Sequence, residues 1–177
     1  MTRTTLQPHS PWPRILDRSL ERRKTPPEAA YRASAGAADV DDRRELDPAE
    51  RDSVLEIALL MATANGSTSP EELSSLADLV AHLEGSRPLA GQLSTKMNAI
   101  EQRGIGGTVE ERVRAIAATL HRLLPRELAY KAAYAIRVSD LESNPDEEDL
   151  ADLLIEVLAL DDLAADLENE VNEALMG

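Results

Sequence analysis

The residues best suited to chemistry are carboxylates gathered in one short stretch of the sequence. Six side chains with oxygen ligands fall between residues 140 and 148: Asp140, Glu142, Asn144, Asp146, Glu147 and Glu148. Hard cations such as Ca²⁺ and Mg²⁺ bind several oxygen ligands of this kind. The stretch is not an EF-hand, because Pro145 and Ala151 stand where that loop needs glycine and glutamate. A cation site here must therefore draw on a second stretch.

A second stretch of the same kind lies 75 residues earlier. The offset aligns a polar residue, a helix-capping side chain, a proline and a glutamate: Asn65 with Asp140, Ser69 with Asn144, Pro70 with Pro145, and Glu72 with Glu147. Proline is tolerated at the first helical position, and the glutamate can accept a hydrogen bond from the N–H of the cap. The sequence therefore predicts a duplicated helix–acidic turn–helix hairpin.

Pairing of the two hairpins about a pseudo-two-fold axis would bring the two turns together. The predicted ligands of a divalent cation, Ca²⁺ or Mg²⁺, are then Asn65, Glu72, Asp140, Glu142 and Glu147. The alternative is that these residues only cap helices, which explains every motif position without a ligand. The sequence leaves both possibilities open.

The motif resembles that of the TerB-like tellurite-resistance family. The first copy, residues 65–72, has Asn65 where the family usually has aspartate, and the second keeps Asp140 but has Leu141 in place of glycine. The resemblance covers residues 48–176. It implies an all-α domain of bacterial stress response, of the tellurite- or metal-resistance type, whose motif acids are associated with metal ions.

Composition and charge narrow the class of partner. The chain has 177 residues, no cysteine and a net charge of −14, so disulfides and thiolate metal sites are excluded. Residues 1–32 hold seven bases and three acids, a balance of +4, which leaves −18 for the rest. An acidic body repels nucleic acid and anionic membranes and attracts cations and basic proteins. With no apolar run of spanning length and no signal segment, we expect a cytoplasmic protein with protein partners, basic or membrane-associated, and no membrane insertion.

Residues 1–46 are predicted to form a flexible, basic, proline-rich extension. Five prolines interrupt it: Pro8, Pro11, Pro13, Pro26 and Pro27. Within it, four apolar side chains would share one face of a short helix and could bind a partner: Trp12, Ile15, Leu16 and Leu20. Isolated helices of this length are marginal in water. The alternatives are a disordered tail or a helix that lies on the chain's own acidic body.

Residues 47–177 are predicted to form one all-α domain, a single bundle of about seven helices with an internal duplication. Apolar residues recur at helical spacing between cap and proline signals throughout this range. The third helix, for example, should start near Pro88 and turn Leu89, Leu93, Met97 and Ile100 inward. Pro125 should separate the fourth helix from the fifth.

Two function classes fit these observations. The first is a non-enzymatic binding module of the TerB-like kind that binds a divalent cation, a protein partner or both. The alternative is a small metal-dependent hydrolase that uses the carboxylates of the acidic turns. Catalytic metal sites in helical bundles usually use Glu-x-x-His pairs, and the sequence has none. The expectation is therefore a protein that is not an enzyme.

Overall fold

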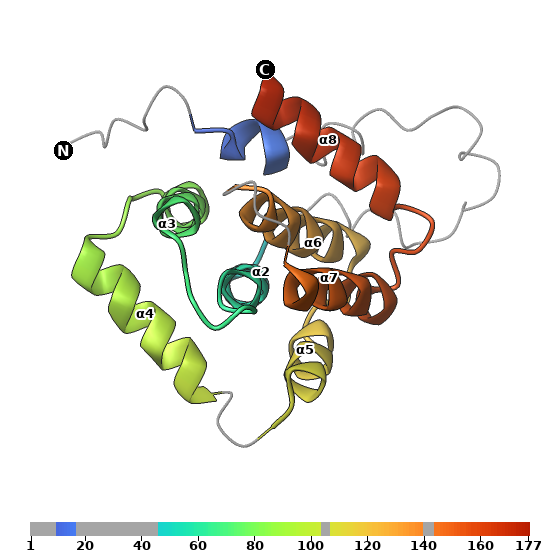
Figure 1. Cartoon of the computed structure of the whole chain (residues 1–177), viewed down its shortest axis with the longest axis horizontal. Helices are drawn as coiled ribbons and strands as arrows, with labels where there is room; N and C mark the ends of the chain where they lie inside the picture. The colour runs from blue at the N-terminus through green and yellow to red at the C-terminus, as the bar shows by residue number, and fades with distance from the viewer. Residues whose placement is uncertain (1–9, 17–45, 104–106, 140–143) are drawn as a thin grey trace.

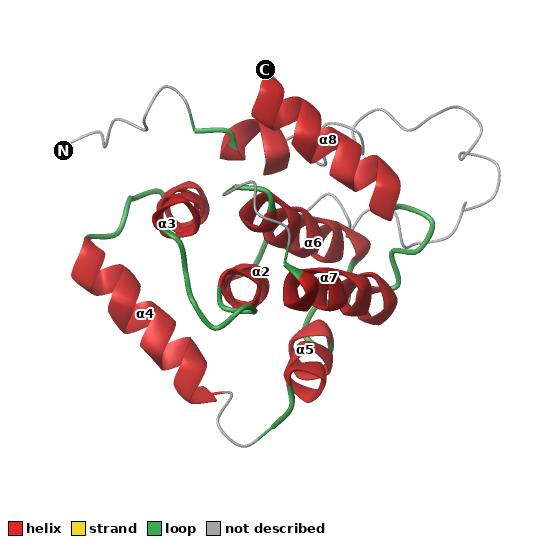
Figure 2. Ribbon diagram, in the orientation of Figure 1, coloured by secondary structure: helices red, strands yellow, loops and turns green. Residues whose placement is uncertain are grey.

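The computed structural model describes residues 10–16, 46–103, 107–139 and 144–177. These residues form helices and loops without a strand (Figure 2), so the predicted all-α class is confirmed. The labelled helices are α2 (Pro48–Ala62), α3 (Pro70–Glu84), α4 (Ala90–Arg103), α5 (Val109–Ala117), α6 (Leu123–Arg137), α7 (Pro145–Leu158) and α8 (Ala164–Met176). Within these ranges none of the helices has both the length and the apolar character needed to cross a membrane.

Side-chain caps fix where several helices begin. At the start of α2 the Asp47 carboxylate accepts a hydrogen bond from the Glu50 N–H, and the Glu50 carboxylate accepts one from the Asp47 N–H, both at 2.9 Å. Thr108 and Glu111 form the same reciprocal pair at the start of α5. Such boxes satisfy two N–H groups that have no partner within the helix. The cap signals therefore predicted these helix starts correctly.

α2 and α6 lie side by side at the centre of the bundle and pack on each other more extensively than any other pair (Figure 1). Around them, α3 packs on α2 and α6, while α7 packs on α6 and α2. Leu59 and Leu154 belong to the shared core, with 3% and 0% of their surfaces exposed. Adding 75 to the bounds of α2 gives the bounds of α6, and adding 75 to the first residue of α3 gives that of α7. The 75-residue offset of the motif thus extends to the helices beside it.

Two helix predictions differ from the structure. α6 begins at Leu123, so Pro125 lies in its first turn, where its missing N–H has no helical partner to lose. α4 begins at Ala90, and Leu89 precedes it with 72% of its surface exposed. Of the predicted inward residues, Ile100 is buried, whereas Leu93 and Met97 pack only partly against the core.

The N-terminal segment, residues 10–16, differs most from the prediction. Residues 12–16 are helical and lie beside α3, α6 and α8 (Figure 1). The predicted partner-binding face is buried in the chain's own core: Trp12 and Ile15 are fully buried and Leu16 is 3% exposed. The acidic body supplies an apolar surface that a helix this short needs in order to form. This part of the predicted flexible extension is therefore packed on the body of the chain. Leu20, the fourth residue of the predicted face, lies outside the described residues, as do residues 1–9 and the rest of 17–45.

Polar contacts hold both ends of this segment. The indole N–H of Trp12 donates to the backbone oxygen of Ser75 in α3 at 2.9 Å. At the other end, Nζ of the fully buried Lys131 in α6 donates to the backbone oxygen of Ile15 at 3.0 Å. Lys131 is also paired with Glu170 of α8, 2.5 Å from Nζ to Oε2. One ammonium group thus joins the segment, α6 and α8.

Further polar contacts join α6 and α8 beside Lys131. The Tyr130 hydroxyl donates to Glu168 at 2.5 Å, and the Asn172 amide donates to the Tyr134 hydroxyl at 3.2 Å. Burial, together with the bond to Glu168, raises the pKa of the Tyr130 phenol. Tyr130 therefore acts as a hydrogen-bond donor at any physiological pH.

Candidate functional site

The first motif turn connects α2 to α3 and is fixed by its own side chains. Gly66 takes a positive φ of 81°, which glycine adopts without strain. The Asn65 side-chain oxygen accepts a hydrogen bond from the Ser67 N–H at 2.9 Å. Ser69 and Glu72 then form a complete capping box at the start of α3, with bonds of 2.7 and 3.1 Å. Capping thus accounts for Ser69 and for one role of Glu72.

The second motif turn connects α6 to α7 and caps its helix differently. The Asn144 side-chain oxygen accepts from the Asp146 N–H at 2.9 Å, not from the N–H of Glu147, so the reciprocal box is not formed. Glu147 nevertheless lies in the interior, 2% exposed, as Glu72 does at 1%. The two glutamates that the offset aligns are therefore both buried, although their surroundings differ.

One hydrogen bond joins the two copies of the motif. Asn65 Nδ2 donates to Glu147 Oε1 at 3.0 Å, across 82 positions of sequence. The side-chain oxygen of Asn65 accepts hydrogen bonds from the N–H and the hydroxyl of Ser67. Contacts at both the nitrogen and the oxygen therefore fix the orientation of the amide. An aspartate at 65 would place two carboxylates together. The predicted approach of the two turns is thus found for Asn65 and Glu147.

The remaining predicted ligands are not all placed. Asp140 and Glu142 lie outside the described residues. Within the described ranges, no three side chains of histidine, cysteine, aspartate or glutamate are grouped so that they could hold a metal ion. In the described part of the chain, Asn65 turns its amide nitrogen to Glu147 and its oxygen to Ser67, so these two predicted ligands do not present two oxygens to one cation.

A groove of about 400 Å³ lies next to this pair, between the end of α2 and the start of α7. Its floor is apolar and includes Leu60, Leu150 and Leu153, while its charged residues are Asp146 and Asp149. Val109, 55% exposed, lies at its edge. An apolar floor with two aspartates suits a long basic side chain, which can bury its stem and pair its charged head.

Aspartate in place of Asn65 is expected to destabilise the fold. Asn65→Asp removes a donor and puts a second carboxylate against buried Glu147, so the free energy of unfolding should fall by about 1–3 kcal/mol at pH 7. Protonation removes the repulsion, so the loss should shrink near pH 4, where carboxyl groups take up protons. Urea denaturation at the two pH values measures both effects.

The control is the same chemical change at an exposed position. Asn169→Asp in α8 should alter the free energy of unfolding by no more than about 0.5 kcal/mol at either pH. Equal effects of the two substitutions would show that Asn65 and Glu147 do not interact in solution.

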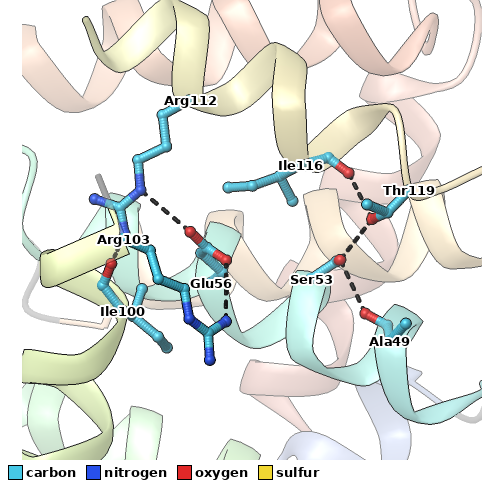
Figure 3. Close-up of polar contacts among 8 residues, drawn as sticks. All are labelled: Ala49, Ser53, Glu56, Ile100, Arg103, Arg112, Ile116 and Thr119. Atoms are coloured by element: carbon cyan, nitrogen blue, oxygen red, sulfur yellow. Dashed lines mark hydrogen bonds and ion pairs between the residues drawn. The ribbon is translucent and has the colours of Figure 1, made fainter. Parts of the chain in front are cut away.

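A larger cleft, which the sequence did not indicate, lies between α2, the C-terminal end of α4 and α5 (Figure 3). Its volume is about 530 Å³. Glu56 of α2 lies at its centre and accepts a hydrogen bond from Nε of Arg112 at 3.2 Å, while Nη1 of Arg103 lies 3.9 Å from the same carboxylate. Arg112 also donates to the backbone oxygen of Ile100 at 2.6 Å and so ties α4 to α5.

The hydroxyl groups of this cleft form hydrogen bonds that stabilise the fold. Ser53 and Thr119 lie 2.6 Å apart, Ser53 lies 2.9 Å from the Ala49 oxygen, and Thr119 lies 2.7 Å from the Ile116 oxygen. The two hydroxyl groups therefore have only two protons to share among three short contacts. The partners of Ser53 are a carbonyl and another hydroxyl, not a base, so it lacks the activation that a nucleophilic serine requires.

Comparison of the chain with protein-family models, curated proteins and solved structures finds no match.

Proposed function

We propose that the chain is a non-enzymatic, TerB-like helical module of bacterial stress response that acts by binding in the cytoplasm. Its site is the pair of motif turns together with the acidic groove beside them. The turns take a divalent cation, Ca²⁺ or Mg²⁺, or the groove takes a basic side chain of a partner protein. A role in tellurite or metal resistance is part of the proposal and follows from the resemblance of the motif.

The observation that carries the proposal is the bond from Asn65 to Glu147. It joins the first motif turn to the first turn of α7, 82 positions apart in the sequence. The first turn of α7 carries Asp146, Glu147 and Glu148, which repel one another, and a bound cation or a basic side chain would relieve that repulsion. The shared 75-residue offset of motif and helix bounds also supports an internal duplication of the TerB-like kind. Capping explains Ser69 and Asn144, but it does not explain the contact between Glu147 and Asn65 of the other hairpin.

The cation is tested by its effect on thermal stability. At fixed ionic strength, millimolar Ca²⁺ or Mg²⁺ should raise the Tm of the parent chain, because a ligand that binds only the folded state stabilises it. Asp140→Asn and Glu147→Gln should abolish that rise while leaving the far-ultraviolet circular dichroism spectrum unchanged. A rise confined to one of the two ions would identify the ion.

Asp162→Asn is the matched control, since Asp162 is exposed in the turn before α8. It should keep the full response to the ion. Equal rises in the parent and in Asp140→Asn would instead show general screening of an acidic surface. The cation would then be excluded, and only docking of a basic partner at the groove would remain.

A further inference from the structure

We infer that the groove between the end of α2 and the start of α7 receives an arginine side chain of a partner protein, and that an apolar residue beside this arginine covers Val109. The groove is formed by α2, α5 and α7, which pack on one another (Figure 1). The inference rests on the proposed function, in which the groove binds a basic partner, and it names the side chain that enters. We call this surface the arginine groove.

The size of the arginine groove suits a side chain better than a bare ion. Its volume is about 400 Å³, whereas one water molecule takes up about 30 Å³ of the liquid. Within the described ranges, no three histidine, aspartate or glutamate side chains come close enough together to hold a metal ion. Leu60, Leu150 and Leu153 supply an apolar floor on which methylene groups can lie. The occupant is therefore an organic group with an apolar stem.

The charges around the arginine groove favour a cation. Asp146 and Asp149 are exposed, and neither pairs with a base within the described part of the chain. Thr63 and Ala64 come from the C-terminal end of α2, where the helix dipole is negative, and the last turn of α2 has no basic residue. The first turn of α7 carries three acids, which outweigh the partial positive charge of that helix end. The groove therefore attracts a cationic group.

The spacing of the two aspartates favours arginine over lysine. Asp146 and Asp149 are three positions apart on α7, so they are neighbours on the surface of the helix. A planar guanidinium has five N–H donors and can bond two carboxylates at once, whereas an ammonium group is a compact charge. The guanidinium is also the more weakly hydrated of the two, so it gives up less when a partner covers it. Arginine is thus the base that uses both carboxylates.

Val109 indicates what lies beside the arginine. It is the first residue of α5, and 55% of its surface is exposed at the edge of the groove. The two acids that follow it already have partners, since Glu110 pairs with Arg114 and Glu111 accepts from the Thr108 N–H. An apolar residue of the partner that covers Val109 removes apolar surface from water and adds affinity without a further charge. The partner therefore carries an arginine flanked by an apolar residue.

The test titrates the full chain, isotope-labelled for NMR, with short peptides whose ends are blocked. The probe is the tripeptide leucine–arginine–leucine, and the chemical shifts of the groove residues report its binding at fixed ionic strength. Citrulline in place of the arginine keeps the shape without the charge and should weaken binding roughly tenfold. Lysine in its place should weaken binding roughly threefold. Glycine in place of both leucines should also weaken it roughly threefold.

Variants of the chain locate the site. Asp149→Asn should weaken binding of the leucine–arginine–leucine probe roughly tenfold. Asp152→Asn is the matched control, since Asp152 is an exposed aspartate of α7 outside the groove, and it should leave the affinity within roughly twofold. Val109→Ser should weaken the leucine-containing probe but not glycine–arginine–glycine. All three positions are exposed, so the circular dichroism spectra should match that of the parent.

Four outcomes would overturn the inference. Equal binding of the citrulline and arginine probes would refute a charged occupant, and equal binding of the lysine probe would refute the choice of arginine. Equal effects of Asp149→Asn and Asp152→Asn would place the probe elsewhere. Self-association of the chain that Asp149→Asn abolishes would make a second copy the occupant. The divalent cation of the proposed function is tested by Tm without any peptide, so either idea can fail while the other holds.

Discussion

Glu170→Leu is expected to lower the free energy of unfolding by about 3–5 kcal/mol, which is the usual cost of removing one partner of a buried ion pair. The side chain of Lys131 has no exposed surface, so its charge cannot turn to water when the carboxylate is removed. The Ile15 oxygen, to which Lys131 also donates, is a neutral acceptor and compensates only in part. Urea denaturation of the parent and the variant measures the loss.

Lys131→Met, which removes the other partner of the pair, should lower the free energy of unfolding by less than Glu170→Leu does. The difference between the two losses tests this explanation. Glu170 keeps 22% of its side-chain surface exposed, although the Oε2 that pairs with Lys131 is itself buried, so in Lys131→Met a turn of the side chain brings this oxygen to water. We expect a loss of about 1–3 kcal/mol, mainly from the unpaired Ile15 oxygen. Combining Lys131→Met with Glu170→Leu should recover most of the stability lost in Glu170→Leu, since apolar replacements of buried pairs are often neutral. Strictly additive losses would mean that the two side chains do not interact.

Trp12→Ala is expected to lower the free energy of unfolding by about 3–5 kcal/mol, the usual cost of truncating a buried tryptophan. The indole is fully buried and donates a hydrogen bond to Ser75, so the change creates a cavity and leaves a carbonyl without its donor. Chemical denaturation followed by circular dichroism gives the value without relying on tryptophan fluorescence.

Leu89→Ala is the control for an apolar residue that the sequence placed in the core. Since 72% of Leu89 is exposed, its truncation should change stability by no more than about 0.5 kcal/mol. A small loss for Trp12→Ala, close to that of Leu89→Ala, would show that the N-terminal segment does not pack on the body in solution.

The fold class could be predicted because helix signals are local. Asp47, Ser69 and Thr108 each combine with a glutamate three residues later, and the structure has the three capping boxes. The place of the N-terminal segment could not be predicted in this way. Its helix is stabilised by Ser75 and Lys131, which lie 63 and 116 positions away, and local propensity contains no information about such contacts.

The part of the candidate site that follows the 75-residue offset could be predicted from the sequence. The 75-residue offset drew attention to both turns, and the structure brings Asn65 of the first against Glu147, which follows the second. The cleft around Glu56 had no comparable signal. Its residues come mainly from α2 and α5, with Arg103 from the end of α4. How closely three helices approach depends on the volumes of all their neighbours, which no short motif encodes.

The bond between Lys131 and the Ile15 oxygen also sets an order of events during synthesis. A ribosome releases the N-terminal residues first, so Trp12 emerges well before α6 and α8, whose Lys131 and Glu170 complete its groove. Until α6 and α8 have been made, the segment has only α3 of its three neighbours to pack on. A product that stopped before α8 would keep Trp12, Ile15 and Leu16 exposed, in the form that chaperones and proteases recognise. Docking of the segment therefore reports that α8 has been made.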